Sequence, residues 1–154
     1  MAEAIDMVEL VRSLPKRRRG RACAVMTYDY TEQPEWAATL ARKTDAQHLD
    51  VLKLFVSEET LAQELAPYTP ESLFSLLKEH GQNEVVIVSS MEFLKATWSG
   101  QPQAAQEFAR RMETWQTSPA LCFVMQHDKE LADQPFRRFR QYRFVVDQRE
   151  TLAL

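Results

Sequence analysis

The chain has 154 residues, enough for one domain that buries roughly two thirds of the surface its unfolded form exposes. Its 45% hydrophobic and 27% charged content is typical of globular proteins, and its formal net charge of −3 excludes a general attraction to nucleic acids or anionic membranes. Because no apolar run approaches the ~18 residues of a membrane span, and the N-terminus is acidic and amphipathic, we expect a cytoplasmic protein that does not bind membranes.

We expect a single domain over residues 1–154, with an N-terminal helix in 1–14 and an α/β core over 20–148. Apolar residues three apart predict the first helix over 2–14, and Pro15 ends it. Short apolar runs predict strands at 22–28, 48–56, 84–90, 120–126 and 142–147.

Helices are expected between these strands. They follow Pro34, Ser57, Thr69 and Pro102, and include a short helix within 127–141. The run EVVIVSS at 84–90 has four consecutive β-branched residues, which indicates a strand buried on both faces at the centre of the sheet. This alternation predicts a three-layer α/β sandwich around a mainly parallel five-stranded sheet.

Ligands of such sheets bind beyond the carboxyl ends of the strands, so the residues there are the first candidates for chemistry. Residues 27–35, TYDYTEQPE, follow the first strand and contain no glycine or lysine that could hold phosphates. The third strand ends in Ser89 and Ser90, and Glu92 beyond it is expected to be a surface carboxylate.

The element order over roughly residues 20–148 resembles the core of P-loop ATPases of the AAA-like or STAND type. The chain's size, its short first helix and its closing strand are similar to the small BrxF-type protein of BREX phage-defence systems. The resemblance implies a P-loop NTPase-like topology with a nucleotide loop after the first strand. It also implies metal-holding carboxylates after the third strand and a polar sensor after the fourth. Only the polar sensor has a counterpart here, Gln126 with His127, so we expect no catalysis, no cofactor and no metal.

Two stretches are strongly basic. The first, KRRRGR, contains Lys16, Arg17, Arg18, Arg19 and Arg21, and is either a solvated loop or a patch that contacts phosphates or an acidic partner. In the second, Arg137, Arg138, Arg140 and Arg143 alternate with Phe136, Phe139 and Tyr142. This pattern is typical of a charge-guarded edge strand with buried rings, of a protein-partner contact, or of a nucleic-acid surface on which rings stack.

The spacing of the cysteines and histidines does not predict a disulfide or a metal site. Cys23 and Cys122 lie in predicted strands, where two small buried side chains are favoured over a disulfide or a metal pair. The isolated His48, His80 and His127 show no zinc-binding spacing.

These observations predict a non-catalytic P-loop-NTPase-like accessory subunit that docks onto an ATPase or DNA-modifying complex, with phage defence as the context. Its partner would be an ATPase, methyltransferase or nuclease subunit, bound through the arginines of 137–143. The alternative is a nucleic-acid-binding module that uses basic segments 16–21 and 137–143. A third interpretation is an enzyme built on Asp29, Glu92 and His127. A homo-oligomer is left open.

Overall fold

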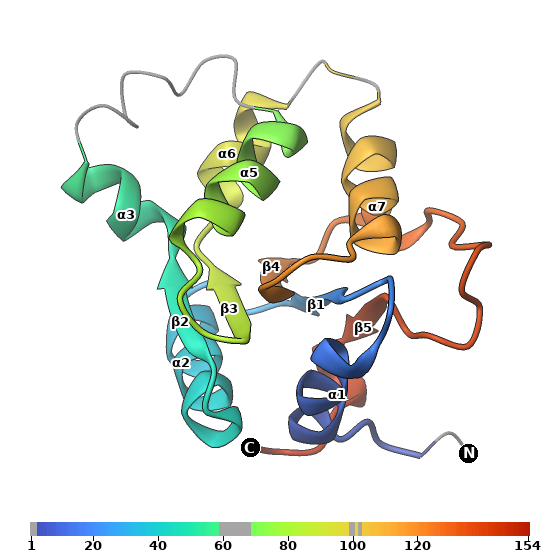
Figure 1. The fold of residues 1–154 in the computed structure, drawn as a ribbon. Helices are drawn as coiled ribbons and strands as arrows, with labels where there is room; N and C mark the ends of the chain where they lie inside the picture. Colours follow the sequence, from blue (N-terminus) through green and yellow to red (C-terminus); the bar gives the residue numbers. More distant parts are fainter. Residues whose placement is uncertain (1–2, 59–68, 99–100, 102) are drawn as a thin grey trace.

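The computed structural model describes residues 3–58, 69–98, 101 and 103–154. One sheet of five parallel strands runs through the molecule in the order β2-β3-β4-β1-β5 (Figure 1). Its strands are β1 (Ala22–Thr27), β2 (Gln47–Asp50), β3 (Val85–Ser89), β4 (Ala120–Gln126) and β5 (Val145–Asp147). The expected α/β class, with a five-stranded parallel sheet between helical layers, is confirmed.

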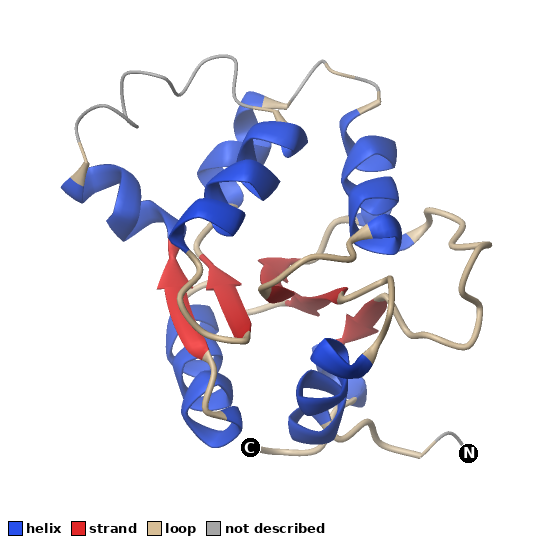
Figure 2. Cartoon of the chain, viewed as in Figure 1, coloured by secondary structure: helices blue, strands red, loops and turns tan. Residues whose placement is uncertain are grey.

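Helices cover both faces of the sheet (Figures 1 and 2). On one face lie α1 (Met7–Ser13) and α2 (Gln33–Thr44); on the other lie α3 (Val51–Ser57), α5 (Pro70–His80), α6 (Glu92–Thr97) and α7 (Ala104–Thr114). The short α8 (Lys129–Ala132) packs on this second face through buried Leu131, and 3-10 turns span Leu14–Lys16 and Gln148–Glu150. Two apolar cores result, one on each face of the sheet.

The largest core lies under α5 and α7. Phe74, Phe108 and Phe123 contact one another with ring centroids 4.8 to 5.4 Å apart, in tilted or edge-to-face arrangements. Such pairs stabilise a core beyond the apolar area they bury. In the opposite core, Cys23 and Cys122 are register neighbours on β1 and β4, and both are free, buried thiols. The interpretation of the cysteines as small buried side chains is therefore confirmed.

The strand predicted at 48–56 is wrong in its second half. Its residues from Val51 onward form α3 instead, because Asp50 caps that helix by accepting a hydrogen bond from Lys53 N at 3.0 Å. Val51 and Phe55, four residues apart, are the buried side chains of this helix. A run of apolar residues this short does not distinguish a strand from a buried helix, which explains the error.

Two other boundaries and the position of the central strand also differ from the prediction. The first helix begins at Met7 rather than residue 2, because Asp6 caps it and Ile5 forms a parallel bridge with Thr151. The last strand begins at Val145 rather than residue 142. The strand β3, Val85–Ser89, is buried throughout, as expected, but the middle strand of the sheet is β4. The helix predicted after Ser57 lies outside the described residues, and the described part of the chain contains no helix long and apolar enough to cross a bilayer.

Candidate functional site

The carboxyl ends of β1 and β4 form the crevice in which this fold would hold a ligand. The two strands are neighbours, and the chain leaves β1 toward α2 on one face and β4 toward α8 on the other. A crevice where connections diverge in this way is the usual ligand site of an open α/β sheet. The side chains at this point therefore determine what the domain can bind there.

A hydrogen-bonded pair, Gln33 and Glu92, occupies this crevice. Gln33 begins α2 and is 1% exposed, and its Nε2 donates to Glu92 Oε1 at 2.7 Å and to Thr27 Oγ1 at 3.2 Å. Its Oε1 accepts from Ser90 N at 3.2 Å, while Glu92 Oε1 also accepts from Gln126 N at 2.8 Å. We call these residues, Thr27, Gln33, Ser90, Glu92 and Gln126, the crevice network. It joins the ends of β1, β3 and β4 to the start of α2.

The expectation that Glu92 is a surface carboxylate is wrong. Its Oε1 accepts two hydrogen bonds, and its Oε2 is buried without a donor among the described residues, as is Gln126 Oε1. The network therefore contains buried acceptor oxygens, whereas phosphates are bound by donors. Gln33 was missed by sequence reasoning, and its position one residue before a helix-starting proline gives no signal of this role.

Ser89, the last residue of β3, and Ser90 tie that strand to β2. Ser90 Oγ donates to Asp50 Oδ2 at 3.1 Å, and Ser89 Oγ lies 2.7 Å from His48 Nε2. Burial lowers the pKa of His48, so the neutral ring is favoured in this contact. Ser90 adopts a left-handed conformation with φ of 59°, which directs its N–H to Gln33. Both serines thus fill structural roles at the end of β3.

The loop between β1 and α2 is folded on itself. Asp29 accepts hydrogen bonds from Thr31 Oγ1 at 2.7 Å and from Thr31 N at 3.0 Å, and these bonds lower the pKa of Asp29. His127 stacks on Tyr28 with ring centroids 5.3 Å apart. Among the described residues, no hydrogen bond joins Asp29, Glu92 and His127 to one another.

Beyond the crevice, Arg149 and Asp147 form an ion pair next to Tyr28. Arg149 NH2 lies 2.9 Å from Asp147 Oδ2, and its guanidinium carbon lies 3.9 Å from the Tyr28 ring centroid. The hydrogen bond from Arg149 lowers the pKa of Asp147 from its usual 3.8 to about 2. The described residues contain no cluster of three or more His, Cys, Asp or Glu side chains placed to hold a metal ion.

Asp147→Asn is expected to destabilise the protein at neutral pH but not at strongly acidic pH. Because the pKa of Asp147 is depressed in the folded protein, its contribution is present above about pH 4 and is lost as the pH falls toward 2. Urea unfolding of wild type and variant at pH 7, 4 and 2 measures this difference. A gap between the two proteins that stays constant over this range would contradict the assignment.

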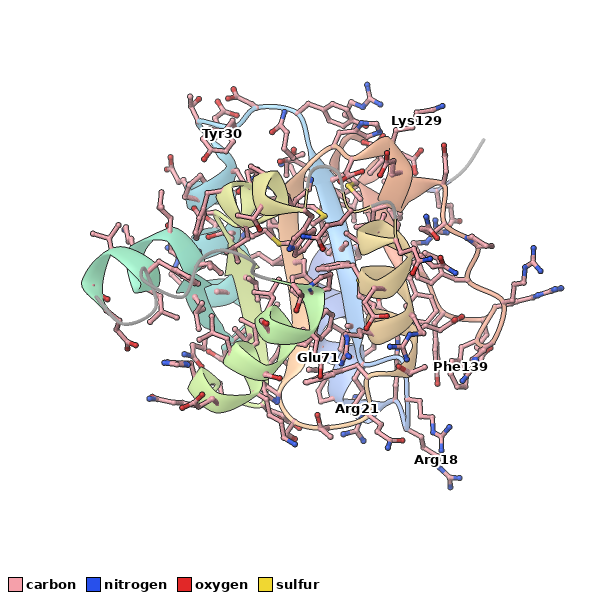
Figure 3. The ribbon with its side chains drawn as sticks, turned by 90° about the horizontal axis from the view of Figure 1, so that it is seen from above. Arg18, Arg21, Tyr30, Glu71, Lys129 and Phe139 are labelled. Atoms are coloured by element: carbon pink, nitrogen blue, oxygen red, sulfur yellow. The ribbon has the colours of Figure 1, made fainter. Side chains whose placement is uncertain are left out.

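At the opposite, amino end of the sheet, the two basic segments predicted from the sequence lie together. The guanidinium carbon of Arg17 lies 4.2 Å from the Tyr142 ring centroid, and Arg17 NH1 donates to Gly20 O at 3.0 Å. Arg21 Nε donates to Arg17 O, which fixes this turn further. Figure 3 shows Arg18, Arg21 and Phe139 at one end of the sheet and Tyr30 and Lys129 at the other. Residues more than a hundred positions apart therefore form one patch.

We call the exposed cations of this patch the joined basic surface: Lys16, Arg18, Arg19, Arg137, Arg138, Arg140 and Arg143. Arg17 is not one of them, because it is only 8% exposed, and burial lowers its pKa. Its role is to support the surface from beneath, with its charge against the face of Tyr142. The prediction of a basic patch over residues 16–21 therefore does not hold for Arg17, whose side chain is buried.

The aromatic rings of this segment pack against one another. Phe136 stacks on Phe144 with centroids 4.8 Å apart, and Tyr142 contacts Phe144 edge-on at 6.3 Å and Phe139 at 6.0 Å. Because the ring of Tyr142 is also in contact with Arg17, these rings do not stand free as stacking platforms. Phe136, Phe139 and Tyr142 are half-buried rather than buried.

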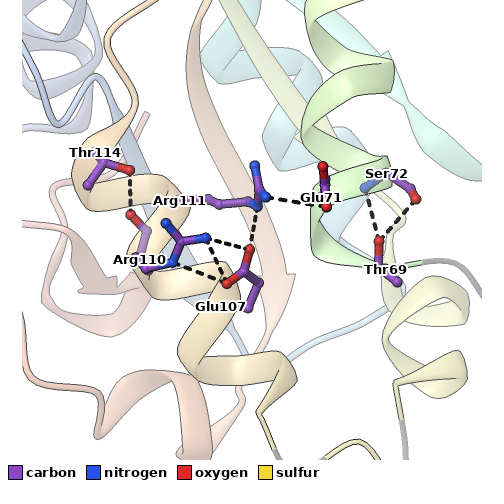
Figure 4. Close-up of polar contacts among 7 residues, drawn as sticks. All are labelled: Thr69, Glu71, Ser72, Glu107, Arg110, Arg111 and Thr114. Carbon is purple, nitrogen blue, oxygen red and sulfur yellow. Dashed lines mark hydrogen bonds and ion pairs between the residues drawn. The ribbon is translucent and has the colours of Figure 1, made fainter.

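The arginines of the joined basic surface differ from those elsewhere in the chain. On α7, Arg110 and Arg111 pair with Glu107 at 2.8 and 2.7 Å, and Arg111 also reaches Glu71 of α5 at 3.5 Å (Figure 4). Within the described ranges, by contrast, no carboxylate lies within 4.0 Å of any cation of the joined basic surface. The segment is instead held by its backbone, since Arg138 N donates to the buried Glu113 Oε2 at 2.9 Å.

Gly20→Ala is expected to destabilise the protein by about 1–3 kcal/mol and to disturb the joined basic surface. Gly20 has a φ of +65°, and an added Cβ would lie 3.0 Å from the Phe144 ring. Urea unfolding measures the loss, with Arg19→Ala, an exposed neighbour, as the control that should change little. Equal stability of Gly20→Ala and wild type would show that the turn tolerates a side chain.

No protein-family model matches this chain, and no curated protein matches it significantly.

Proposed function

We propose that the protein is a non-catalytic, P-loop-NTPase-like accessory subunit that docks onto an ATPase or DNA-modifying complex. The crevice network supports the first part of this proposal, that the protein is non-catalytic. Gln33 and Glu92 are hydrogen-bonded to each other and to the ends of β1, β3 and β4, the edge at which an open α/β sheet binds its ligands, and Glu92 Oε2 is a buried acceptor. This arrangement supports a role in binding a partner rather than in turning over a nucleotide.

The joined basic surface is the proposed docking site. Its cations are exposed, and none of them has a carboxylate partner within the described chain. Arginine side chains bind carboxylates and phosphates through two parallel hydrogen bonds, which gives geometric specificity. The expected partner is an ATPase, methyltransferase or nuclease subunit with an acidic surface, and phage defence is the proposed context.

The test is recovery of partners with the tagged protein from its native host, with and without nuclease treatment. We expect an ATPase, methyltransferase or nuclease subunit that survives nuclease treatment and is lost when Arg137, Arg138 and Arg140 are replaced by alanine. Recovery of no such protein, or recovery unaffected by the triple substitution, would contradict the proposal.

Nucleic-acid binding through the same surface is the second candidate, favoured by its unpaired cations. It would be a contact with phosphates, because the rings pack against one another and are not free for base stacking. Anisotropy of labelled single- and double-stranded DNA then shows affinity that falls steeply with salt and similar affinity for different sequences. No binding at low salt would remove this candidate.

A further inference from the structure

A separate cavity of about 130 Å³ lies between α6, α7, α8 and the end of β4. Its floor is apolar and buried, with Phe108, Met125 and Leu131 exposed by 3% or less. Ala104 and Ala105 leave the space open on the α7 side. The crevice network does not line this cavity, and the joined basic surface lies at the other end of the sheet.

The mouth of the cavity is polar and carries an excess of negative charge. Lys95 Nζ lies 3.1 Å from Asp128 Oδ2 and 3.4 Å from Gln126 O, while Asp128 Oδ1 caps α8 by accepting from Leu131 N at 3.2 Å. Burial alone would raise the pKa of Asp128, but the Lys95 charge and these hydrogen bonds lower it, so the carboxylate is ionised at neutral pH. Glu130 adds an exposed carboxylate that forms no ion pair within the described residues.

The geometry points to a binding site for a small aromatic amine. A dry apolar cavity of about 150 Å³ accepts a benzene ring, so this volume suits one ring of that size. The ring would pack against Phe108, Met125 and Leu131, and the ammonium group would lie at the mouth near Asp128 and Glu130. Lys95 holds Asp128 in place but does not neutralise the second carboxylate. An apolar body with one correctly placed polar group is the usual pattern of a small-molecule site.

Titration calorimetry with phenethylamine tests this site. We expect a dissociation constant on the order of 1 mM, as suits so few non-hydrogen atoms. Two matched probes separate the contributions. Propylamine keeps the ammonium group but lacks the ring, and 3-phenylpropionate keeps the ring but reverses the charge. We expect both to bind at least about 10-fold more weakly than phenethylamine. Equal or tighter binding of 3-phenylpropionate, or no binding of phenethylamine, would overturn the assignment.

Two variants test whether phenethylamine binds in this cavity. Ala105→Leu fills the cavity and is expected to abolish phenethylamine binding, and circular dichroism checks that the variant is folded. Glu130→Gln removes the exposed carboxylate at the mouth of the cavity. It is expected to weaken the binding of phenethylamine about 3- to 10-fold and to leave the binding of a neutral ring compound such as benzyl alcohol unchanged. Glu79→Gln, an exposed change on α5, is the charge-matched control. If Glu130→Gln and Glu79→Gln gave the same affinity as wild type, binding would lie elsewhere.

Discussion

Replacing Glu92 with alanine is expected to lower the free energy of unfolding by about 2–4 kcal/mol. In the folded protein, Glu92 Oε1 accepts from Gln33 Nε2 at 2.7 Å and from Gln126 N at 2.8 Å. Alanine would leave both donors without this acceptor, and Gln33 is 1% exposed, so water cannot easily replace it. A buried donor that loses its partner costs about 1–3 kcal/mol. Urea unfolding monitored by tryptophan fluorescence measures the change.

Glu92→Gln is the matched control. An amide oxygen can accept the same two hydrogen bonds, and the amide nitrogen replaces the buried Oε2 that has no donor among the described residues. We expect this variant to be much closer to wild type than Glu92→Ala. If Glu92→Ala unfolded at the wild-type urea concentration, the crevice network would not hold the strand ends together. The interpretation of the crevice as closed would then fail.

The triple substitution of Arg137, Arg138 and Arg140 with alanine is expected to weaken partner binding by about 100-fold or more. The guanidinium groups of these residues are exposed, whereas the fold depends on the backbone N–H of Arg138, which the substitution keeps. The free energy of unfolding should therefore change little. Binding of the purified partner subunit, measured by interferometry or calorimetry, gives the affinity.

Alanine at Arg42, Lys43 and Lys78 is the control for net charge. These residues are exposed, lie on α2 and α5, and remove the same amount of positive charge from another part of the surface. If both triple variants weakened the partner equally, the effect would come from overall charge rather than from a docking surface. That result would contradict the role of the joined basic surface.

Local pattern was sufficient to predict most of the fold. The helix after Thr69 is a clear case, because Thr69 caps it by accepting from Ser72 N at 3.2 Å, Leu73 and Leu77 are buried, and Gly81 follows its last residue. The strand at 120–126 has the predicted bounds as well. Prediction failed for 51–56, where one capping aspartate decides between strand and helix.

The candidate sites could be predicted only as separate parts. Both basic segments were identified from composition, but their association depends on contacts across the sheet, such as Arg17 with Tyr142. Spacing along the chain contains no information on such pairs. At the crevice, the sequence predicted what is missing but not what is present. Residues 27–35 contain no glycine or lysine of a phosphate-binding loop. Gln33, the buried centre of the crevice network, resembles any polar residue at a helix start.

The contact of Arg17 with Tyr142 can form only after both segments have been synthesised. Arg17 precedes the first strand, and Tyr142 and Phe144 precede the last, so the surface exists only after nearly the whole domain has been synthesised and folded. A nascent chain emerging from the ribosome carries the first basic segment without its aromatic support. A partner that recognised the assembled surface would therefore distinguish the folded domain from a folding intermediate.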